Sequence, residues 1–211
     1  MDVLQTLEKC ILVPVIKLDS AESATPLAET LKANGLPVAE ITFRTAAAGA
    51  AIRNISRDVP DVLLGAGTVL SVDQVKEAVD AGASFIVTPG FNPAVVDYCV
   101  DNKIPITPGI NNPTGVESAL SRGLSVVKFF PAEASGGVKM IKAMAAPYTE
   151  VRYIPTGGIS AANLGDYLAL KAILAVGGSW MVPSDKIKAG DFAAVGALVR
   201  EAVSLAKRLR P

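Results

Sequence analysis

Residues 63–107 read LLGAGTVLSVDQVKEAVDAGASFIVTPGFNPAVVDYCVDNKIPIT, and this stretch decides the fold. Short apolar, β-rich runs alternate in it with longer segments of helical character. The predicted order is strand 63–69, helix 71–81, strand 85–88, helix 93–102 and strand 104–107. A helix between two strands returns the chain to the start of the next strand, so this order is typical of a parallel sheet.

The same alternation extends over the rest of the chain. The sequence predicts eight strands, at 11–18, 38–44, 63–69, 85–88, 104–107, 126–130, 152–155 and 173–176. It predicts helices at 20–34, 46–57, 71–81, 93–102, 113–121, 137–145, 161–168 and 192–208. Eight units in series predict an α/β fold, a (β/α)₈ TIM barrel with 1–211 as a single domain. An open doubly wound sheet is the alternative, but no GxGxxG motif follows the first strand.

Composition excludes several classes of function. The 211 residues contain 20 basic and 20 acidic side chains, so no net charge favours nucleic acid or an anionic membrane. Histidine is absent, which excludes Ser-His and Cys-His catalysis and histidine-ligated metals. Two cysteines, Cys10 and Cys99, are too few for a disulfide framework, and the N-terminus lacks the features of a signal peptide. We therefore expect a cytoplasmic protein without metal or cofactor.

Lys128 lies within the apolar run VVKFFP at 126–131. Strand alternation places Lys128 and Phe130 on one face and Val127 and Phe129 on the other. Desolvation disfavours the charged form of a lysine, which makes the neutral amine available as a Schiff-base nucleophile. A snorkelling or ion-paired lysine is the structural alternative.

The run VAEITFR at 38–44 carries a second polar face, formed by Glu40, Thr42 and Arg44. In a barrel this face points inward, where a charge is costly unless it is paired or used. A helix with a Glu–Arg surface pair has the same spacing, and a purely structural buried ion pair is a further alternative. Ile, Thr and Phe favour the strand.

Lysine, carboxylate and arginine together are what imine chemistry on a 2-oxo acid requires. Lys128 would form the iminium, Glu40 would move protons, and Arg44 would hold the substrate carboxylate through paired hydrogen bonds. None of these steps needs a metal.

Glycine clusters end the last two predicted strands, as Thr156-Gly157-Gly158 and as Gly177-Gly178-Ser179. Barrels of this kind commonly bind phosphate at these two strand ends, against backbone amides. Ordinary turn glycines are the structural alternative. Thr68, and Pro89 in the turn 88–90, either contact substrate or only shape their loops.

Several motifs together resemble the family of 2-keto-3-deoxy-6-phosphogluconate (KDPG) aldolases, which are bifunctional with 4-hydroxy-2-oxoglutarate (KHG) aldolase. The resemblance covers essentially the whole chain. Its motifs are VAEITFRT at 38–45, GAGTVL at 65–70, VKFFPAE at 127–133, PTGGIS at 155–160 and GGSW at 177–180.

The resemblance implies a class I aldolase. Such an enzyme cleaves KDPG to pyruvate and glyceraldehyde 3-phosphate, and KHG to pyruvate and glyoxylate. The resemblance assigns Lys128 as the Schiff-base lysine and Glu40 as the general acid/base. The implied substrate-binding residues are Arg44, Thr68, Pro89, Phe130 and Thr156, and the implied phosphate-binding residues are Gly157, Gly158, Gly178 and Ser179. It also implies a homotrimer.

Two alternatives stay open at the level of sequence. One is an aldolase for the C4 epimer, 2-keto-3-deoxy-6-phosphogalactonate, because epimer choice depends on small differences in contact geometry. The other is a non-catalytic phosphosugar-binding barrel, because fold does not imply function.

Overall fold

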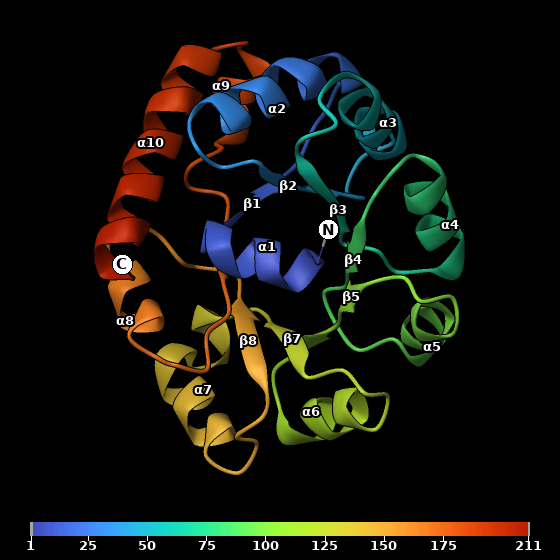
Figure 1. The fold of residues 1–211 in the computed structure, drawn as a ribbon, viewed down its shortest axis with the longest axis vertical. Helices are drawn as coiled ribbons and strands as arrows, with labels where there is room; N and C mark the ends of the chain where they lie inside the picture. Colours follow the sequence, from blue (N-terminus) through green and yellow to red (C-terminus); the bar gives the residue numbers. More distant parts are fainter. Residues whose placement is uncertain (1, 211) are drawn as a thin grey trace.

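The computed structural model describes residues 2–210 and consists of parallel strands surrounded by helices (Figure 1). The strands are β1 (Leu12–Ile16), β2 (Val38–Thr42), β3 (Leu63–Gly67), β4 (Phe85–Val87), β5 (Ile106–Thr107), β6 (Gly109–Ile110), β7 (Val126–Phe129), β8 (Arg152–Pro155) and β9 (Val176–Gly178). The helices are α1 (Val3–Cys10), α2 (Ala24–Ala33), α3 (Ala48–Asp58), α4 (Val72–Asp80), α5 (Pro93–Asp101), α6 (Pro113–Leu120), α7 (Gly137–Ala145), α8 (Leu164–Leu168), α9 (Ser184–Lys188) and α10 (Phe192–Leu209). The predicted α/β class and parallel sheet are confirmed.

The strands form two curled parallel sheets. Six strands pair in the order β5-β4-β3-β2-β1-β9, and three pair in the order β6-β7-β8. Pro108 separates β5 from β6, since proline has no N–H for the ladder. Isolated parallel bridges, Tyr153 with Ile173 and Thr156 with Gly177, link the β8 segment to the segment of β9.

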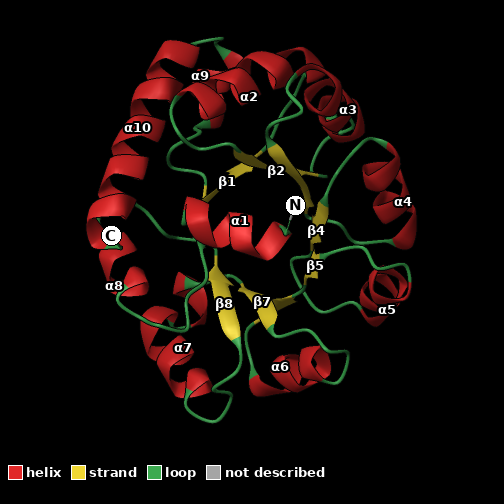
Figure 2. Ribbon diagram, in the orientation of Figure 1, coloured by secondary structure: helices red, strands yellow, loops and turns green. Residues whose placement is uncertain are grey.

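Helices cover the outer face of the strands, and α1 lies in front of the strands in this view (Figure 2). The residues between the helices and the strands are closely packed. Leu7 of α1 is 1% exposed, and Phe85, Phe129 and Tyr153 are buried on the strands. Within residues 2–210, no helix is long and apolar enough to cross a membrane.

Several predicted boundaries were wrong. The fifth strand, predicted to end at 107, continues beyond Pro108 as β6, because Gly109 and Ile110 pair with β7. The second strand ends at Thr42, so Arg44 lies in the following loop. The eighth strand was predicted at 173–176, but β9 spans Val176–Gly178. Helices α1 and α9 were not predicted.

Candidate active site

Lys128 and Glu40 form a buried ion pair. Lys128 lies on β7 and Glu40 on β2, and the Lys128 Nζ is 3.3 Å from the Glu40 Oε1. The two residues are 4% and 3% exposed. The amine can therefore transfer its proton directly to the carboxylate, shielded from bulk water.

Gly67, at the end of β3, leaves the space that the Glu40 carboxylate occupies. A Cβ at Gly67 would lie 2.2 Å from the Glu40 Oε1 and 2.7 Å from its Cγ. Any other residue at this position would displace the carboxylate from the amine. Sequence reasoning assigned no role to Gly67, because the contact depends on the register between β2 and β3, which pairs Thr42 with Gly67.

A small interior cavity surrounds the ion pair. Its lining residues are Leu7, Val13, Glu40, Phe85, Val87, Thr107, Lys128, Ile154 and Thr156. The predicted substrate residue Thr156 is thus beside the amine. Thr107 was missed, because its TPG sequence was interpreted only as a turn. Leu7 was also missed, because its place in the cavity depends on how α1 packs.

Arg44 and Thr68 meet at the ends of β2 and β3. The Arg44 Nε donates to the Thr68 Oγ1 at 3.3 Å. Thr68 has a φ of 55°, a left-handed conformation that is uncommon for threonine and turns its loop sharply. The arrangement leaves the terminal nitrogens of an exposed guanidinium available for a carboxylate.

Phe130 lies close to the Lys128 amine and shares a cleft with Pro89. The Phe130 ring centroid is 5.4 Å from the Lys128 Nζ. Phe130 and Pro89 line a shared cleft of about 790 Å³, together with Asn111 and Asn112. This apolar wall next to the amine would limit access of water.

The two glycine loops follow adjacent strand ends. Gly157 and Gly158 have φ values of 105° and 78°, which other residues rarely adopt. Among residues 2–210, none accepts a hydrogen bond from the backbone N–H of Gly157, Gly158 or Ser179. Gly178, at the end of β9, packs against the ring of Trp180. Free N–H groups at adjacent loops are suited to bind an anion.

The comparisons with known proteins agree with this arrangement. A family model described as KDPG and KHG aldolase matches residues 3–198. The chain belongs to this aldolase family. The family predicted from the motifs is thereby confirmed.

Two sequence relatives and one solved structure illustrate the likeness to the family. The chain is 52% identical to a 2-dehydro-3-deoxy-phosphogluconate aldolase of Haemophilus influenzae, over 97% of both chains. It is 47% identical to the KHG/KDPG aldolase of Escherichia coli, over 92% of both. A KDPG aldolase of Legionella pneumophila, with pyruvate captured at low pH as a covalent carbinolamine, has a TM-score of 0.92 and 36% identity, covering 95% of this chain and 98% of that one.

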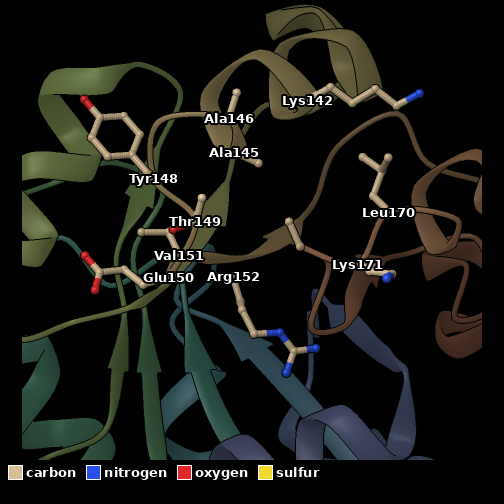
Figure 3. A pocket seen from close by; sticks show the side chains of 11 residues that line it. Lys142, Ala145, Ala146, Tyr148, Thr149, Glu150, Val151, Arg152, Leu170 and Lys171 are labelled. Carbon is tan, nitrogen blue, oxygen red and sulfur yellow. The ribbon is translucent and has the colours of Figure 1, made fainter.

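A second cleft in this aldolase-family chain lies away from the ion pair. It measures about 520 Å³ and lies between the end of α7 and the segment leading to β9 (Figure 3). Arg152, the first residue of β8, lines it and donates to the Glu8 Oε1 at 2.8 Å. None of the predicted site residues lines this cleft, which lies at the opposite end of β8 from Thr156.

The remaining nucleophiles do not belong to the ion-pair site. Burial raises the pKa of the Cys99 thiol to about 11, and burial also raises the pKa of Cys10. Both thiols are therefore poor nucleophiles at neutral pH. In the part of the chain that the structure describes, no three His, Cys, Asp or Glu side chains are grouped to hold a metal ion.

Proposed function

We propose that this chain is a class I aldolase that cleaves 2-dehydro-3-deoxy-6-phosphogluconate to pyruvate and glyceraldehyde 3-phosphate. The same site would cleave 4-hydroxy-2-oxoglutarate to pyruvate and glyoxylate. The observation that carries the proposal is the 3.3 Å contact between the buried Lys128 Nζ and Glu40 Oε1. Family membership supports the substrate class.

The proposed reaction begins when the Lys128 amine adds to the C2 carbonyl of the substrate. Glu40 moves protons while the carbinolamine loses water and becomes a protonated imine. Glu40 then takes the proton of the C4 hydroxyl through a water molecule, the C3–C4 bond breaks, and the bonding electron pair passes into the enamine as the aldehyde leaves. Protonation at C3 and hydrolysis of the imine release pyruvate and the free amine.

The other predicted site residues would hold the substrate. The Arg44 guanidinium and the Thr68 hydroxyl bind the carboxylate beside C2, with Pro89 and Phe130 enclosing the pyruvyl group. Thr156 would contact the substrate near the bond that breaks and contribute to stereoselectivity, a role supported by its place in the cavity that Lys128 also lines. The phosphate is bound by the N–H groups of Gly157, Gly158 and Ser179 and by the Gly178 loop, as supported by their lack of internal partners in residues 2–210.

At the level of the molecule, we propose one closed (β/α)₈ barrel and a single domain over 1–211. The bridges between the β8 and β9 segments, and the pairing of β9 with β1, support closure.

We further propose a homotrimer, by resemblance to the family, and a cytoplasmic location, supported by two free cysteines. Light scattering at micromolar concentration tests the trimer.

Pyruvate release from three substrates tests the proposed function. The substrates are the phosphogluconate-derived acid, its C4 epimer and 4-hydroxy-2-oxoglutarate, with Lys128→Ala as the inactive control. We expect the wild-type protein to release pyruvate from the first and third substrates, and Lys128→Ala to release it only at the background rate. Preference for the epimer would make the chain a phosphogalactonate-type aldolase. Binding of all three without turnover would favour the non-catalytic barrel.

A further inference from the structure

Glu133, which follows β7, contacts the glycine loop that follows β8. Its backbone N–H donates to the Gly157 carbonyl at 3.0 Å, and the Ala132 N–H donates to the Thr156 carbonyl at 2.8 Å. A Cβ at Gly158 would lie 2.7 Å from both the Cβ and the Cγ of Glu133. The backbone and the side-chain stem of Glu133 therefore both support this loop.

The Glu133 carboxylate is held by a different part of the molecule. The Tyr167 hydroxyl, on α8, donates to the Glu133 Oε1, and Tyr167 is fully buried. A Cβ at Gly137 would lie 3.0 Å from the same oxygen, which places the carboxylate at the first turn of α7. A helix N-terminus favours a negative charge. Burial and the hydrogen bond to Glu133 raise the pKa of the Tyr167 hydroxyl, so it stays a donor at neutral pH.

We infer that Glu133 is a positioning residue for the phosphate of the substrate, acting through Gly157 and Gly158. Its stem and backbone fix a loop whose two glycines would otherwise be conformationally free. Tyr167 holds the carboxylate in place, so that it does not approach the phosphate dianion and repel it. This inference rests on the proposed function. It makes Glu133 a determinant of the preference for phosphorylated substrates.

Three variants test the inference by steady-state kinetics on a phosphorylated and a non-phosphorylated substrate. Glu133→Ala keeps the Cβ but removes the Cγ and the carboxylate, and should raise KM for the phosphorylated acid about tenfold, the size of one lost hydrogen bond. Tyr167→Phe should also raise KM for the phosphorylated acid, because the Glu133 carboxylate loses the hydrogen bond that holds it. Glu133→Gln keeps the stem and an oxygen that accepts from Tyr167, so it should restore KM to within about twofold of wild type. For 4-hydroxy-2-oxoglutarate, kcat and KM should not change.

Tyr148→Phe is a matched control, because the Tyr148 hydroxyl donates to the Glu117 Oε1 at 2.8 Å, away from the glycine loop. It should leave KM for both substrates unchanged. The inference is overturned if the Glu133 variants change both substrates equally, which indicates a general structural role. It is also overturned if KM for the phosphorylated acid stays unchanged in Glu133→Ala, or if Glu133→Gln and Glu133→Ala both lower it, as simple removal of a repulsive charge would.

Wild-type protein without turnover of either substrate would contradict the proposed function and not this inference. Binding of inorganic phosphate then supplies the test. Trp180 is the sole tryptophan and packs on Gly178, so its fluorescence should report binding at the loops. We expect Glu133→Ala to weaken phosphate binding about tenfold, with Tyr148→Phe unchanged. Equal affinity in Glu133→Ala and wild type would contradict the inference.

Discussion

At the scale of single residues, we propose that the buried ion pair serves catalysis more than folding. Removing two charges from water costs several kcal/mol, and a pair such as Lys128 with Glu40 recovers that cost only with good geometry. Their contact of 3.3 Å is at the long end for a hydrogen bond. A loosely held amine beside a carboxylate suits a nucleophile that must move onto a substrate.

Glu40→Gln is predicted to fold but to lose most activity. The amide preserves the shape of the side chain but cannot take a proton from the Lys128 amine. General acid–base catalysis contributes about 10²–10⁴-fold, so kcat should fall in that range. Circular dichroism checks the fold, and pyruvate release gives kcat. Unchanged kcat would remove Glu40 from proton transfer.

Gly67→Ala is predicted to lower kcat/KM about 100-fold, because an ångström of misplacement can have that effect. The new methyl would overlap the Glu40 Oε1, which it would approach to 2.2 Å. Gly165→Ala on α8 is the control, since its Cβ would meet the nearest atom, of Leu209, at 3.5 Å, an ordinary contact. Equal activity in the two variants would show that the Glu40 position is unimportant.

The site could be predicted from sequence where a charge interrupts an apolar strand, as Lys128 and Glu40 do. Those signals are local, so no knowledge of neighbours is needed. The sequence could not predict that the cavity includes Thr107 and Leu7 or that Gly67 lies against Glu40, because only the tertiary fold brings these residues close.

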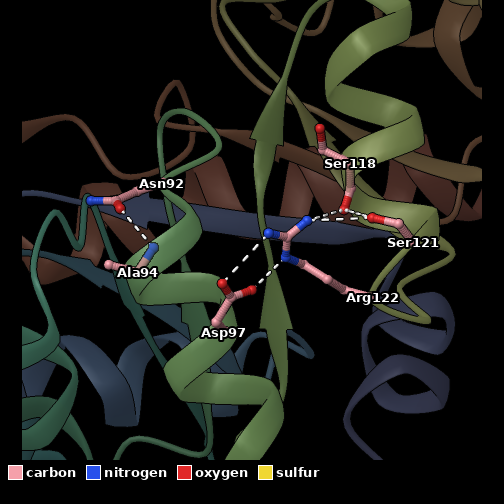
Figure 4. Close-up of polar contacts among 6 residues, drawn as sticks. All are labelled: Asn92, Ala94, Asp97, Ser118, Ser121 and Arg122. Carbon is pink, nitrogen blue, oxygen red and sulfur yellow. Dashed lines mark hydrogen bonds and ion pairs between the residues drawn. The ribbon is translucent and has the colours of Figure 1, made fainter.

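At the scale of elements, Arg122 joins the helices α5 and α6. Its Nε bonds to the Asp97 carboxylate of α5, and its Nη1 donates to the Ser118 carbonyl of α6 at 3.0 Å (Figure 4). The guanidinium also lies 5.1 Å from the Phe91 ring centroid. The hydrogen bond from Arg122 lowers the pKa of Asp97 below its ordinary 3.8.

Arg122→Gln is predicted to lower Tm slightly at pH 7, because the link between helices is lost. A lowered carboxyl pKa stabilises the fold above pH 3.8, and this contribution disappears as pH falls through the lowered value. The Tm difference between variant and wild type should therefore shrink in acid. Thermal melts at pH 7 and below pH 3.8 measure it. Arg57→Gln controls for the link between helices, since the pair that Arg57 forms with its neighbour Asp58 lies within α3 and also lowers a carboxyl pKa. A difference that does not change with pH would contradict the assignment.

Most elements could be predicted because strand and helix periodicities are local. The short helix α9, between Pro183 and Gly190, has too few residues to show a period. The start of helix α1 could have been predicted from Asp2, since its carboxylate accepts from the Leu4 N–H and caps the helix. The interrupted fifth strand could not be predicted, because pairing of Gly109 beyond a proline depends on β7.

At the scale of the molecule, α1 lies in front of the strands in the view of Figure 1. Leu7 points from α1 into the same interior cavity as Lys128 and Glu40. Arg44, Thr68 and the glycine loops follow the carboxyl ends of the strands, whereas α1 precedes the first strand.

Leu7→Ala is predicted to destabilise the fold by about 2–4 kcal/mol, as expected for a buried leucine whose removal leaves a cavity. Leu7 is 1% exposed, whereas Leu4 on the same helix is 37% exposed and supplies the control. Leu4→Ala should have a much smaller effect. Urea unfolding of both variants gives the free energies. Equal effects would show that α1 does not seal the interior.

The central claim is that Lys128 forms an imine with a 2-oxo acid, and reductive trapping tests it most directly. The protein is incubated with pyruvate and sodium borohydride, and the product is examined by intact mass and peptide mapping, with Lys128→Ala in parallel. We predict one reduced pyruvyl adduct per chain, on Lys128, and none in the variant. A folded wild-type protein without an adduct, or with an adduct on another lysine, would contradict the account.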